Sequence, residues 1–428
     1  MPYVAIVFVY AVLRVLAVSG ARPRTYLDRT SYLEVAAEPL WSLRFFAGIR
    51  PWTAPLLYKL LPEGDRYIVA GQLAVSLVCW LALSAATAGC VRRGRFRLVA
   101  FASVLGFSTC LAIVRWDTLV LSESLSISLT AAVLAAWLSF VRRPRPVAIA
   151  AVLATTTLWV FVRDTHMLLV LVTALIIAFW AALPGPRLGQ AVLLIGLVAI
   201  AGASYASTNS EAASLRRRQR ILLHVVGQRV LTDHEATAWF RAHGMPAPSP
   251  RVRANSTRLA ALVEDRPTDP ETDAFLDWVA DHGRVTLASY LVTHPAYALE
   301  PLLTERDVLI DAVPGYRVRG VRLVFPPAEV AYVRSSSAVF ALLGVTVVGG
   351  AVTARVAGAA RWWIVPTAGL AMQVPHAVVV WHGDTLDVAR HALVLGLSLR
   401  LCALLLALFA VSAWLDWRDG PSSRMVPP

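Results

Sequence analysis

The sequence has few charged residues for its length. Only 16% of its 428 residues are Asp, Glu, Lys or Arg, and 57% are hydrophobic, whereas a soluble domain carries about a quarter charged residues. The mean hydropathy is +0.61. The apolar residues fall in blocks of roughly 18 to 24, the length that crosses a bilayer core. A soluble fold would have to bury nearly all of these blocks on every side, so the composition excludes one.

Lysine is almost absent, since Lys59 is the only one, although the net charge is +13. This arginine bias is typical of a GC-rich genome, and it supplies the better bidentate phosphate ligand. Positive charge on such a protein usually serves topology and anionic lipid head groups. No aromatic-rich basic module is present, so nucleic acid is not expected as a partner.

Several motifs that bind soluble cofactors or form nucleophiles are also missing. The sequence has no Gly-rich phosphate loop, no dinucleotide fingerprint, no Asp-x-Asp pair and no nucleophilic serine elbow. A soluble nucleotide donor is therefore not expected. The four cysteines lie within or at the ends of apolar blocks, so they indicate core residues rather than disulfides or a metal site.

Apolar runs between charged boundaries predict an all-α polytopic membrane protein with about ten transmembrane helices. The predicted spans are 3–19, 67–91, 98–114, 123–141, 147–162, 167–183, 188–206, 336–354, 362–381 and 392–415. The first span lacks a basic segment before it, which favours a retained helix over a cleaved signal peptide.

The short loops between spans sort by charge. Arginine-rich loops at 92–97, 142–145 and 355–361 alternate with loops that hold at most one arginine beside acids. Because positive loops stay cytoplasmic, we expect both termini inside a multi-pass protein of the plasma membrane.

Two longer connections fall on the predicted outer side. Residues 20–66 are rich in aromatics and indicate one or two short interfacial helices. Residues 207–335 have the composition of a small, mostly helical domain, and 233–244 show a capping acid, helical spacing and a terminal glycine. The predicted organisation is therefore 1–206 with seven spans, 207–335 as an extracytoplasmic domain, and 336–428 with three spans and a cytoplasmic tail.

Ionisable residues gather in the outer loops. The first loop holds Asp28, Glu34, Arg50 and Lys59, the second Arg115, Asp117 and Glu123, the third Arg163, Asp164 and His166, and the last His382, Asp384, Asp387, Arg390 and His391. Ionisable residues at a membrane edge are costly, so they are candidates for function.

Each group also has a purely structural explanation. Glu123 could stabilise a helix N-terminus, Arg163 could pair locally with Asp164, and Asp387 could pair with Arg390 three residues on. These explanations do not account for four loops bringing acids and arginines to one side.

A divalent metal held by His382, Asp384, Asp387 and His391 is a further possibility. Their spacing matches no strong metal motif, so no metal and no other cofactor is predicted.

Such a set of residues suits transfer from a phosphate-linked donor held in the bilayer. A carboxylate can deprotonate an acceptor hydroxyl as general base. Arginines can bind and neutralise a leaving phosphate, and apolar spans can receive a lipid tail.

Five short motifs carry a resemblance to a known class. They are Asp28-Arg-Thr-Ser-Tyr32, the stretch 48–58, Leu-Ser-Glu123-Ser-Leu, Arg163-Asp164, and Asp387 to His391. In this order the sequence resembles the GT-C-type glycosyltransferases, polytopic enzymes that use polyprenyl-phosphate sugars, and among them the dolichyl-phosphate-mannose mannosyltransferases. The resemblance covers chiefly 1–185, with an echo at 380–400, and implies a bacterial, actinobacterial source.

The resemblance implies roles for individual residues. Asp28 resembles the catalytic base, Glu123 a second acid that lines the acceptor pocket, and Arg163 and Arg390 the phosphate-binding arginines. The substrate-binding candidates are Glu34, Arg50, Asp117, Arg163, Asp164, His166, Asp384, Asp387, Arg390 and His391.

One position departs from the pattern of the class. Many relatives have paired acids in the first loop, but Arg29 follows Asp28 here. Asp28 acts alone, or Glu34 supplies the second carboxylate.

The expected function is inverting transfer of a sugar from a polyprenyl-phosphate carrier to an extracytoplasmic glycan, glycolipid or protein of the cell envelope. One alternative is a transporter or lipid flippase, for which Arg14, His376 and Arg400 near span centres are the candidates, although they form no matched halves. The other is a membrane scaffold whose 207–335 domain binds a partner. A scaffold predicts no cleft that joins Asp28, Glu123 and Arg390.

Overall fold

The structure is a computed structural model of the chain. It describes residues 1–22, 27–179, 187–209, 212–264, 269–311, 318–333, 343, 345–346, 349–350 and 361–418. Within these ranges the chain is α-helical and contains no strand, as the sequence predicts.

Five helical stretches of the described chain are long and apolar enough to cross a membrane. They are α5 (Asp65–Cys90), α8 (Glu123–Arg142), α11 (Arg187–Asn209), the pair α23 (Ile364–Ala371) and α24 (Gln373–Gly383), and α25 (Val388–Arg418). Three shorter apolar helices accompany them, namely α1 (Pro2–Val18), α9 (Pro146–Val160) and α10 (His166–Phe179). Most of each predicted span up to residue 206, and of those at 362–381 and 392–415, is helical where the structure describes it. Residues 180–183 of the span 167–183 and almost all of the span 336–354 lie outside the described residues.

The predicted span 98–114 is not one straight helix. It consists of α6 (Gly94–Ser108) followed by α7 (Leu111–Val114) and the 3-10 turn η1 (Arg115–Thr118), with a bend of 54° between them. If this bent pair crosses the membrane, six such spans are present among the described residues. Asp117 of η1 forms an ion pair with Arg14 of α1, and this pair fixes the direction of the second segment.

The first outer loop folds into three short helices, α2 (Leu27–Ala37), α3 (Leu43–Phe46) and α4 (Thr53–Leu60), where one or two were expected. Two buried tyrosines attach it to the segment before α8. The Tyr32 hydroxyl donates to Ser122 Oγ at 2.9 Å, and the Tyr58 hydroxyl donates to the Leu121 carbonyl at 2.9 Å. These bonds hold α2 and α4 above the N-terminus of α8.

A second hydrophobic core lies in the outer domain. Its buried residues run from Leu223 to Tyr290. The helices of this region are α12 (Ala212–Val225), α13 (His234–Ala242), α14 (Pro250–Ala254), α15 (Leu259–Glu264), α16 (Pro270–Trp278) and α17 (Arg284–Thr293), with π turns at Val226–Val230 and Val279–Gly283 and a 3-10 turn at Ser256–Arg258. The predicted cap is confirmed, since Asp233 Oδ1 accepts from the Ala236 amide.

The chain then returns to the membrane helices. α18 (Pro295–Leu299) and α19 (Pro301–Thr304) pack on α24, and α20 (Arg306–Leu309) packs on α25. α21 (Pro326–Tyr332) packs against α6, and Glu329 Oε2 accepts from the Leu111 amide at 2.7 Å. Although α21 falls in the range predicted for the outer domain, it packs on the membrane helices.

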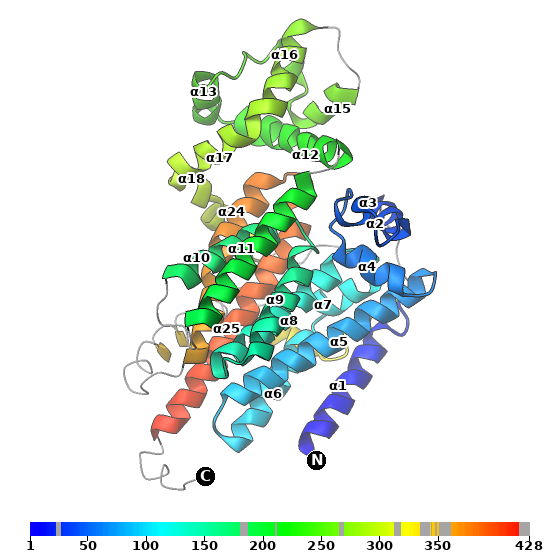
Figure 1. Cartoon of the computed structure of the whole chain (residues 1–428), viewed down its shortest axis with the longest axis vertical. Coiled ribbons are helices and arrows are strands. Elements are labelled where there is room, and N and C mark those ends of the chain that lie inside the picture. Colours follow the sequence, from blue (N-terminus) through cyan, green and yellow to red (C-terminus); the bar gives the residue numbers. More distant parts are fainter. Residues whose placement is uncertain are drawn as a thin grey trace.

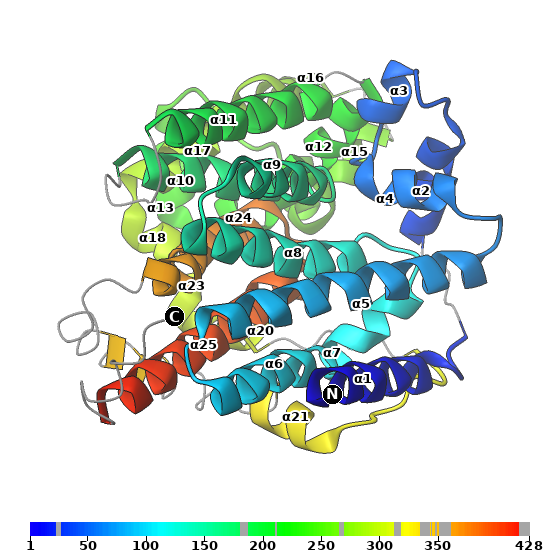
Figure 2. The ribbon, with the colours of Figure 1, turned by 60° about the horizontal axis from the view of Figure 1, so that its bottom comes forward.

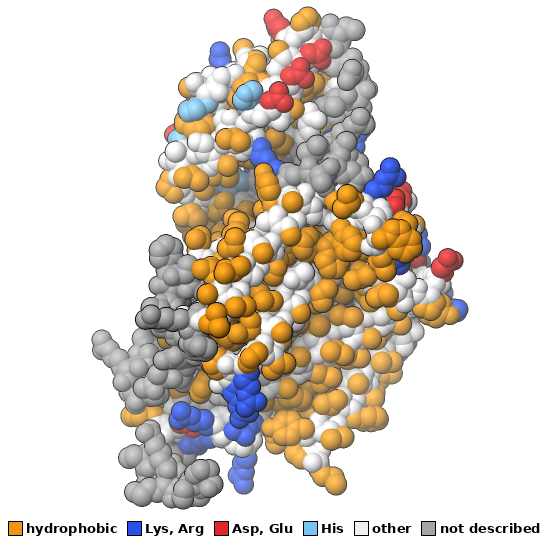
Figure 3. All heavy atoms as spheres, in the orientation of Figure 1, with side chains coloured by type: hydrophobic (Ala, Val, Ile, Leu, Met, Phe, Trp, Pro, Cys, Tyr) orange, Lys and Arg blue, Asp and Glu red, His pale blue; other side chains and the backbone are white. Residues whose placement is uncertain are grey.

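The membrane helices and the outer domain occupy opposite ends of the molecule (Figure 1). The N-terminus of α1 and the C-terminal end of α25 lie at one end, and α12 to α17 lie at the other. Lys and Arg side chains also gather at the end that holds the N-terminus (Figure 3). The side of the membrane that each end faces stays a prediction.

Candidate functional site

Asp28 lies at the centre of a charged cluster. It belongs to the first turn of α2, and its side chain is 30% exposed. Its Oδ1 accepts from Arg50 Nη2 at 2.5 Å, and its Oδ2 accepts from Arg390 Nη1 at 2.9 Å. Arg50 precedes α4 and Arg390 lies in the first turn of α25. The two arginines therefore bind one carboxylate from opposite parts of the chain.

Glu123 belongs to the same cluster and is contributed by α8. It is the first residue of α8 and is buried. Its Oε1 accepts from Arg163 Nη2 at 2.9 Å and lies 3.5 Å from Arg390 Nε. Arg390 also pairs with Asp387, Nε to Oδ2, at 3.0 Å. Arg390 thus bridges acids from three segments.

The electrostatics of Asp28 follow from these contacts. Burial favours the neutral acid, but the positive charges of Arg50 and Arg390 and their hydrogen bonds outweigh it and lower the pKa of Asp28 below its usual value. The carboxylate is ionised at neutral pH. Glu123 Oε2 is buried and has no hydrogen-bond partner among the described residues, so an acceptor group stands free inside the cluster.

A second pair supports the start of α25. Asp384 Oδ2 lies 2.8 Å from His391 Nδ1. Burial opposes ionisation of Asp384, but the hydrogen bond and charge of His391 and the amides of Leu386 and Thr385 lower the pKa of Asp384 to about 2. This pair fixes the loop that carries Arg390 into helix α25.

The possible metal site is not assembled. Among the described residues no three His, Cys, Asp or Glu side chains lie close enough to hold a metal ion. His382 faces away from Asp384 and His391, with its Nε2 3.2 Å from the Ala298 carbonyl.

Two of the predicted acids lie exposed and away from the cluster. Glu34 lies exposed on α2, six residues beyond Asp28 and therefore on another face of the helix. Asp164 is exposed as well, and Arg163 pairs with Glu123 instead of with its neighbour. Neither acid contacts the cluster within the described structure.

Asp117, predicted to bind substrate, instead forms a buried structural ion pair. It is fully buried and pairs with Arg14 of α1, a residue that sequence reasoning did not connect with it. Its Oδ1 accepts from Ser124 Oγ at 2.7 Å, and Arg14 also donates to Ser76 Oγ at 2.6 Å. The pair lies beneath the cluster and fixes the turn that leads to α8.

His166 forms the floor of the site. It is fully buried, its Nδ1 lies 2.8 Å from the Trp159 carbonyl, and its ring stacks on Trp159 with centroids 4.1 Å apart. Because a carbonyl only accepts, Nδ1 carries the proton, and Nε2 accepts from Ser126 Oγ at 3.2 Å.

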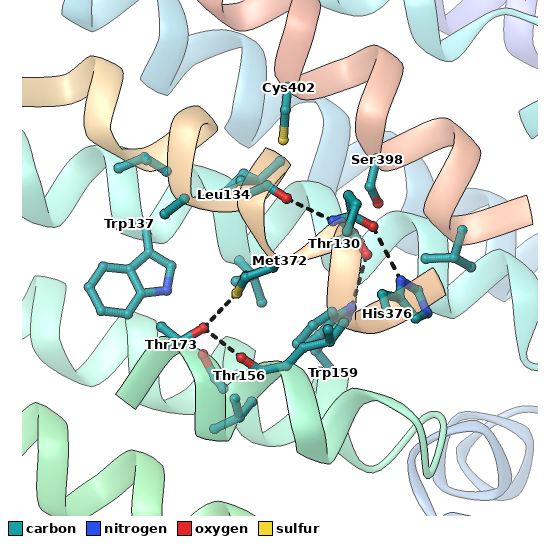
Figure 4. A pocket seen from close by; sticks show the side chains of 18 of the residues that line it. Thr130, Leu134, Trp137, Thr156, Trp159, Thr173, Met372, His376, Ser398 and Cys402 are labelled. Atoms are coloured by element: carbon teal, nitrogen blue, oxygen red, sulfur yellow. Dashed lines mark hydrogen bonds between the residues drawn. The ribbon is translucent and has the colours of Figure 1, made fainter. Parts of the chain in front are cut away.

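An apolar groove lies beneath this floor (Figure 4). Helices α8 to α11 and α23 to α25 supply its walls. Its lining residues are Thr130, Val133, Leu134, Trp137, Val141, Thr156, Trp159, Leu169, Val170, Thr173, Leu197, Ile364, Val365, Ala368, Gly369, Met372, Gln373, His376, Val394, Ser398 and Cys402. The surface that they present to the groove is mainly apolar. The sequence contained no signal for the groove, because groove-facing and lipid-facing apolar residues look alike.

The groove begins close to the cluster. Trp159 lies near the end of α9, and Arg163 follows in the loop after that helix, whereas Val394 lies four residues after Arg390 on α25 itself. Four residues of helix rise about 6 Å. His376, at the edge of the groove in Figure 4, has its ring centroid 6.4 Å from that of His166. The charged cluster therefore lies about one helical turn from one end of the apolar groove.

Comparisons with known proteins identify no family. No family model matches the sequence, and no curated protein matches it. The fold is similar to the archaeal oligosaccharyltransferase AglB from Archaeoglobus fulgidus, solved in complex with an inhibitory peptide and a dolichol-phosphate, with a TM-score of 0.47 and 10% sequence identity. The match covers 99% of this chain and 52% of that one, so the chain spans about half the length of that enzyme.

Proposed function

We propose that this protein is a GT-C-type membrane glycosyltransferase that uses a polyprenyl-phosphate sugar. The observation that carries the proposal is the position of the charged cluster. Carboxylates and arginines from four segments meet at the head of an apolar groove among the membrane helices. An apolar groove can hold a lipid tail, and the adjacent arginines and carboxylates can bind a phosphate and deprotonate a reacting hydroxyl.

The proposed donor has an apolar isoprenoid chain and a charged phosphate, and the two suit different parts of the site. Its isoprenoid chain lies in the groove between α8, α9 and α25, and its phosphate lies at Arg390 and Arg163. In the unliganded protein these two arginines are neutralised by Asp28, Glu123 and Asp387. The phosphate oxygens replace the carboxylates as partners of the arginines, because a guanidinium binds both anions in the same bidentate geometry.

The reaction is a single displacement at the anomeric carbon. The acceptor oxygen forms a bond to that carbon while the bond to the phosphate oxygen breaks. Asp28 takes the proton of the acceptor hydroxyl, and the polyprenyl phosphate leaves with the bonding electron pair, stabilised by the arginines. The configuration at the anomeric carbon is inverted. Asp28 suits the base because its side chain remains partly exposed, whereas Glu123 is 2% exposed.

The acceptor reaches the site from the side of the outer domain. We place this side outside the plasma membrane, with both chain ends in the cytoplasm, on the basis of the arginine-rich loops. The acceptor is then a glycan, glycolipid or protein of the cell envelope.

The two alternative functions have less support. A scaffold predicts no joined site, but Asp28 and Glu123 both contact Arg390. A transporter predicts charges near span centres in matched halves, but Arg14 is paired with Asp117 and Arg400 with Asp311.

The test is a transfer assay with purified protein. Incubation with a panel of polyprenyl-phosphate sugars and envelope acceptors should release polyprenyl phosphate from at least one donor, and the new glycosidic bond should have the inverted configuration by NMR. If every donor stays intact while the protein moves a lipid between leaflets of a vesicle, the transporter reading replaces this one.

A further inference from the structure

The outer domain has an apolar stripe on α17 to α19. Val285, Val292, Leu299 and Leu303 are 74%, 80%, 42% and 81% exposed. Among the side chains that the structure describes in this domain (219–262 and 269–309), every exposed large hydrophobic one belongs to this set. The other large apolar side chains described there are buried or half-buried, so the stripe is a local feature.

The stripe lies on one side of the helices. Val285 and Val292 are seven residues apart on α17, two turns, which places them on the same face. The other face carries Thr286 and Tyr290, which are buried in the domain. Leu299 and Leu303 continue the apolar surface along α18 and α19.

The lower end of the stripe lies at the end of a membrane span. α18 and α19 pack on α24, and the Ala298 carbonyl lies 3.2 Å from Nε2 of His382. His382 is the second-to-last residue of the apolar stretch Ile364–Gly383. Leu299 and Leu303 are therefore at the level where the hydrocarbon core gives way to the head groups.

The stripe also lies at the margin of the molecule. α18 is at the edge in Figure 1, and it stays at the edge, beside α10 and α23, when the membrane end is turned forward in Figure 2. Below it, Leu175 of α10 and Val374 of α24 are exposed on the apolar helices, and Leu386 in the next loop is 62% exposed. The apolar surface of the spans thus continues onto the outer domain.

We propose that the outer domain rests on the lipid bilayer through this stripe, with Leu299 and Leu303 inserted among the lipids and Val292 at head-group level. Continuity with the lipid-facing surface favours lipid over protein. The four aliphatic side chains also cover well under the roughly 800 Å² per partner of a standard protein interface. Interfacial helices bind membranes by inserting such an apolar face.

Lipid quenching of a fluorophore tests this contact. Val292→Cys and Leu303→Cys are made in the full-length chain after its four native cysteines, all buried, are changed to alanine, and each is labelled with bimane in nanodiscs with or without brominated lipid. Ala242→Cys, exposed on α13, is the matched control. We expect quenching at 292 and 303 at least threefold stronger than at 242.

Quenching at 292 and 303 no stronger than at 242 would overturn the proposal. The proposal would also be overturned if the bimane emission shifted to the blue only in nanodiscs that hold two copies of the protein and did not respond to brominated lipid. That result would assign the stripe to contact with a second copy of this chain. The labels report lipid contact and not sugar transfer, so their outcome is independent of the proposed function.

Discussion

At the scale of single residues, the position of Asp28 between two arginines has two consequences. Its lowered pKa keeps the carboxylate ionised, but a low pKa also weakens it as a proton acceptor. When the donor phosphate forms an ion pair with Arg390, one of the two positive charges beside Asp28 is neutralised. The pKa of Asp28 then rises, so donor binding itself makes the base stronger.

Replacing Asp28 tests its role directly. Asp28→Asn keeps the size and the hydrogen-bonding oxygen but cannot accept a proton, so kcat for transfer should fall by about 10²- to 10⁴-fold. The rate of polyprenyl phosphate release measures it. Glu34→Gln, an exposed acid on the same helix, should transfer at the wild-type rate. Full activity of Asp28→Asn would remove Asp28 as the base.

Asp384 gives a prediction for stability against pH. Its pKa falls from 3.8 to about 2 on folding, so its contribution is present above pH 3.8 and is lost as the pH falls toward 2. The shift corresponds to about 2 kcal/mol. Asp384→Asn should lower the free energy of unfolding by that amount at pH 6 and by progressively less below pH 4, as followed by denaturant unfolding in detergent. An equal loss at pH 6 and pH 2.5 would contradict the assignment.

The sequence was enough to identify several site residues, but not the residues that they contact. Asp28, Glu123, Arg163 and Arg390 could be singled out because costly charges stood beside apolar runs, and the structure joins them. The sequence could not tell which face of α2 carries Glu34. It also could not pair Arg14 with Asp117, because such contacts depend on how distant helices pack.

At the scale of elements, the length of the apolar segments predicted where helices occur, but not where a helix is interrupted. The segment 98–114 is apolar throughout, yet α6 and α7 meet at 54°. Arg14 contacts both sides of the bend, since it donates to the Ser108 carbonyl and pairs with Asp117, and such polar contacts lie outside the hydrophobic pattern.

Removing one partner of that pair should disturb the bent segment. Arg14→Met leaves Asp117 charged and buried, so the free energy of unfolding should fall by about 3–5 kcal/mol. The double variant Arg14→Met/Asp117→Leu removes the stranded charge and should recover most of that loss. Unfolding in mixed micelles measures both. A double variant no more stable than the single one would show that the pair is not an isolated electrostatic unit.

Gly320 is a second element-level test. It has φ +87°, and an added Cβ would lie 1.7 Å from the Gly20 carbonyl oxygen, where the chain after the outer domain meets the end of α1. Gly320→Ala should cost on the order of 1–3 kcal/mol from backbone strain alone, and more from the clash. Gly94→Ala, with nothing within 4 Å of the new Cβ, should be neutral or slightly stabilising. Equal melting temperatures for the two variants would contradict this account.

At the scale of the whole molecule, the helical class followed from composition, whereas the assembly of the site did not. Hydropathy places helices along the chain, but it does not show that α8, α9 and α25 enclose a groove. The outer domain likewise could be recognised as a helical unit, and its contacts with α24 and α25 could not. These features depend on side-chain packing between segments that lie hundreds of residues apart.

The most direct test of the central claim is the affinity for a lipid phosphate. Labelled polyprenyl phosphate is titrated into nanodiscs that hold wild-type protein, Arg390→Met at the cluster, Ala368→Phe in the groove, or Val78→Phe on the lipid-facing side of α5, 67% exposed. If cluster and groove form one donor site, the first two variants each bind at least tenfold more weakly, and Val78→Phe binds like the wild type. Unchanged affinity in both Arg390→Met and Ala368→Phe, with the folded state verified by gel filtration, would contradict it.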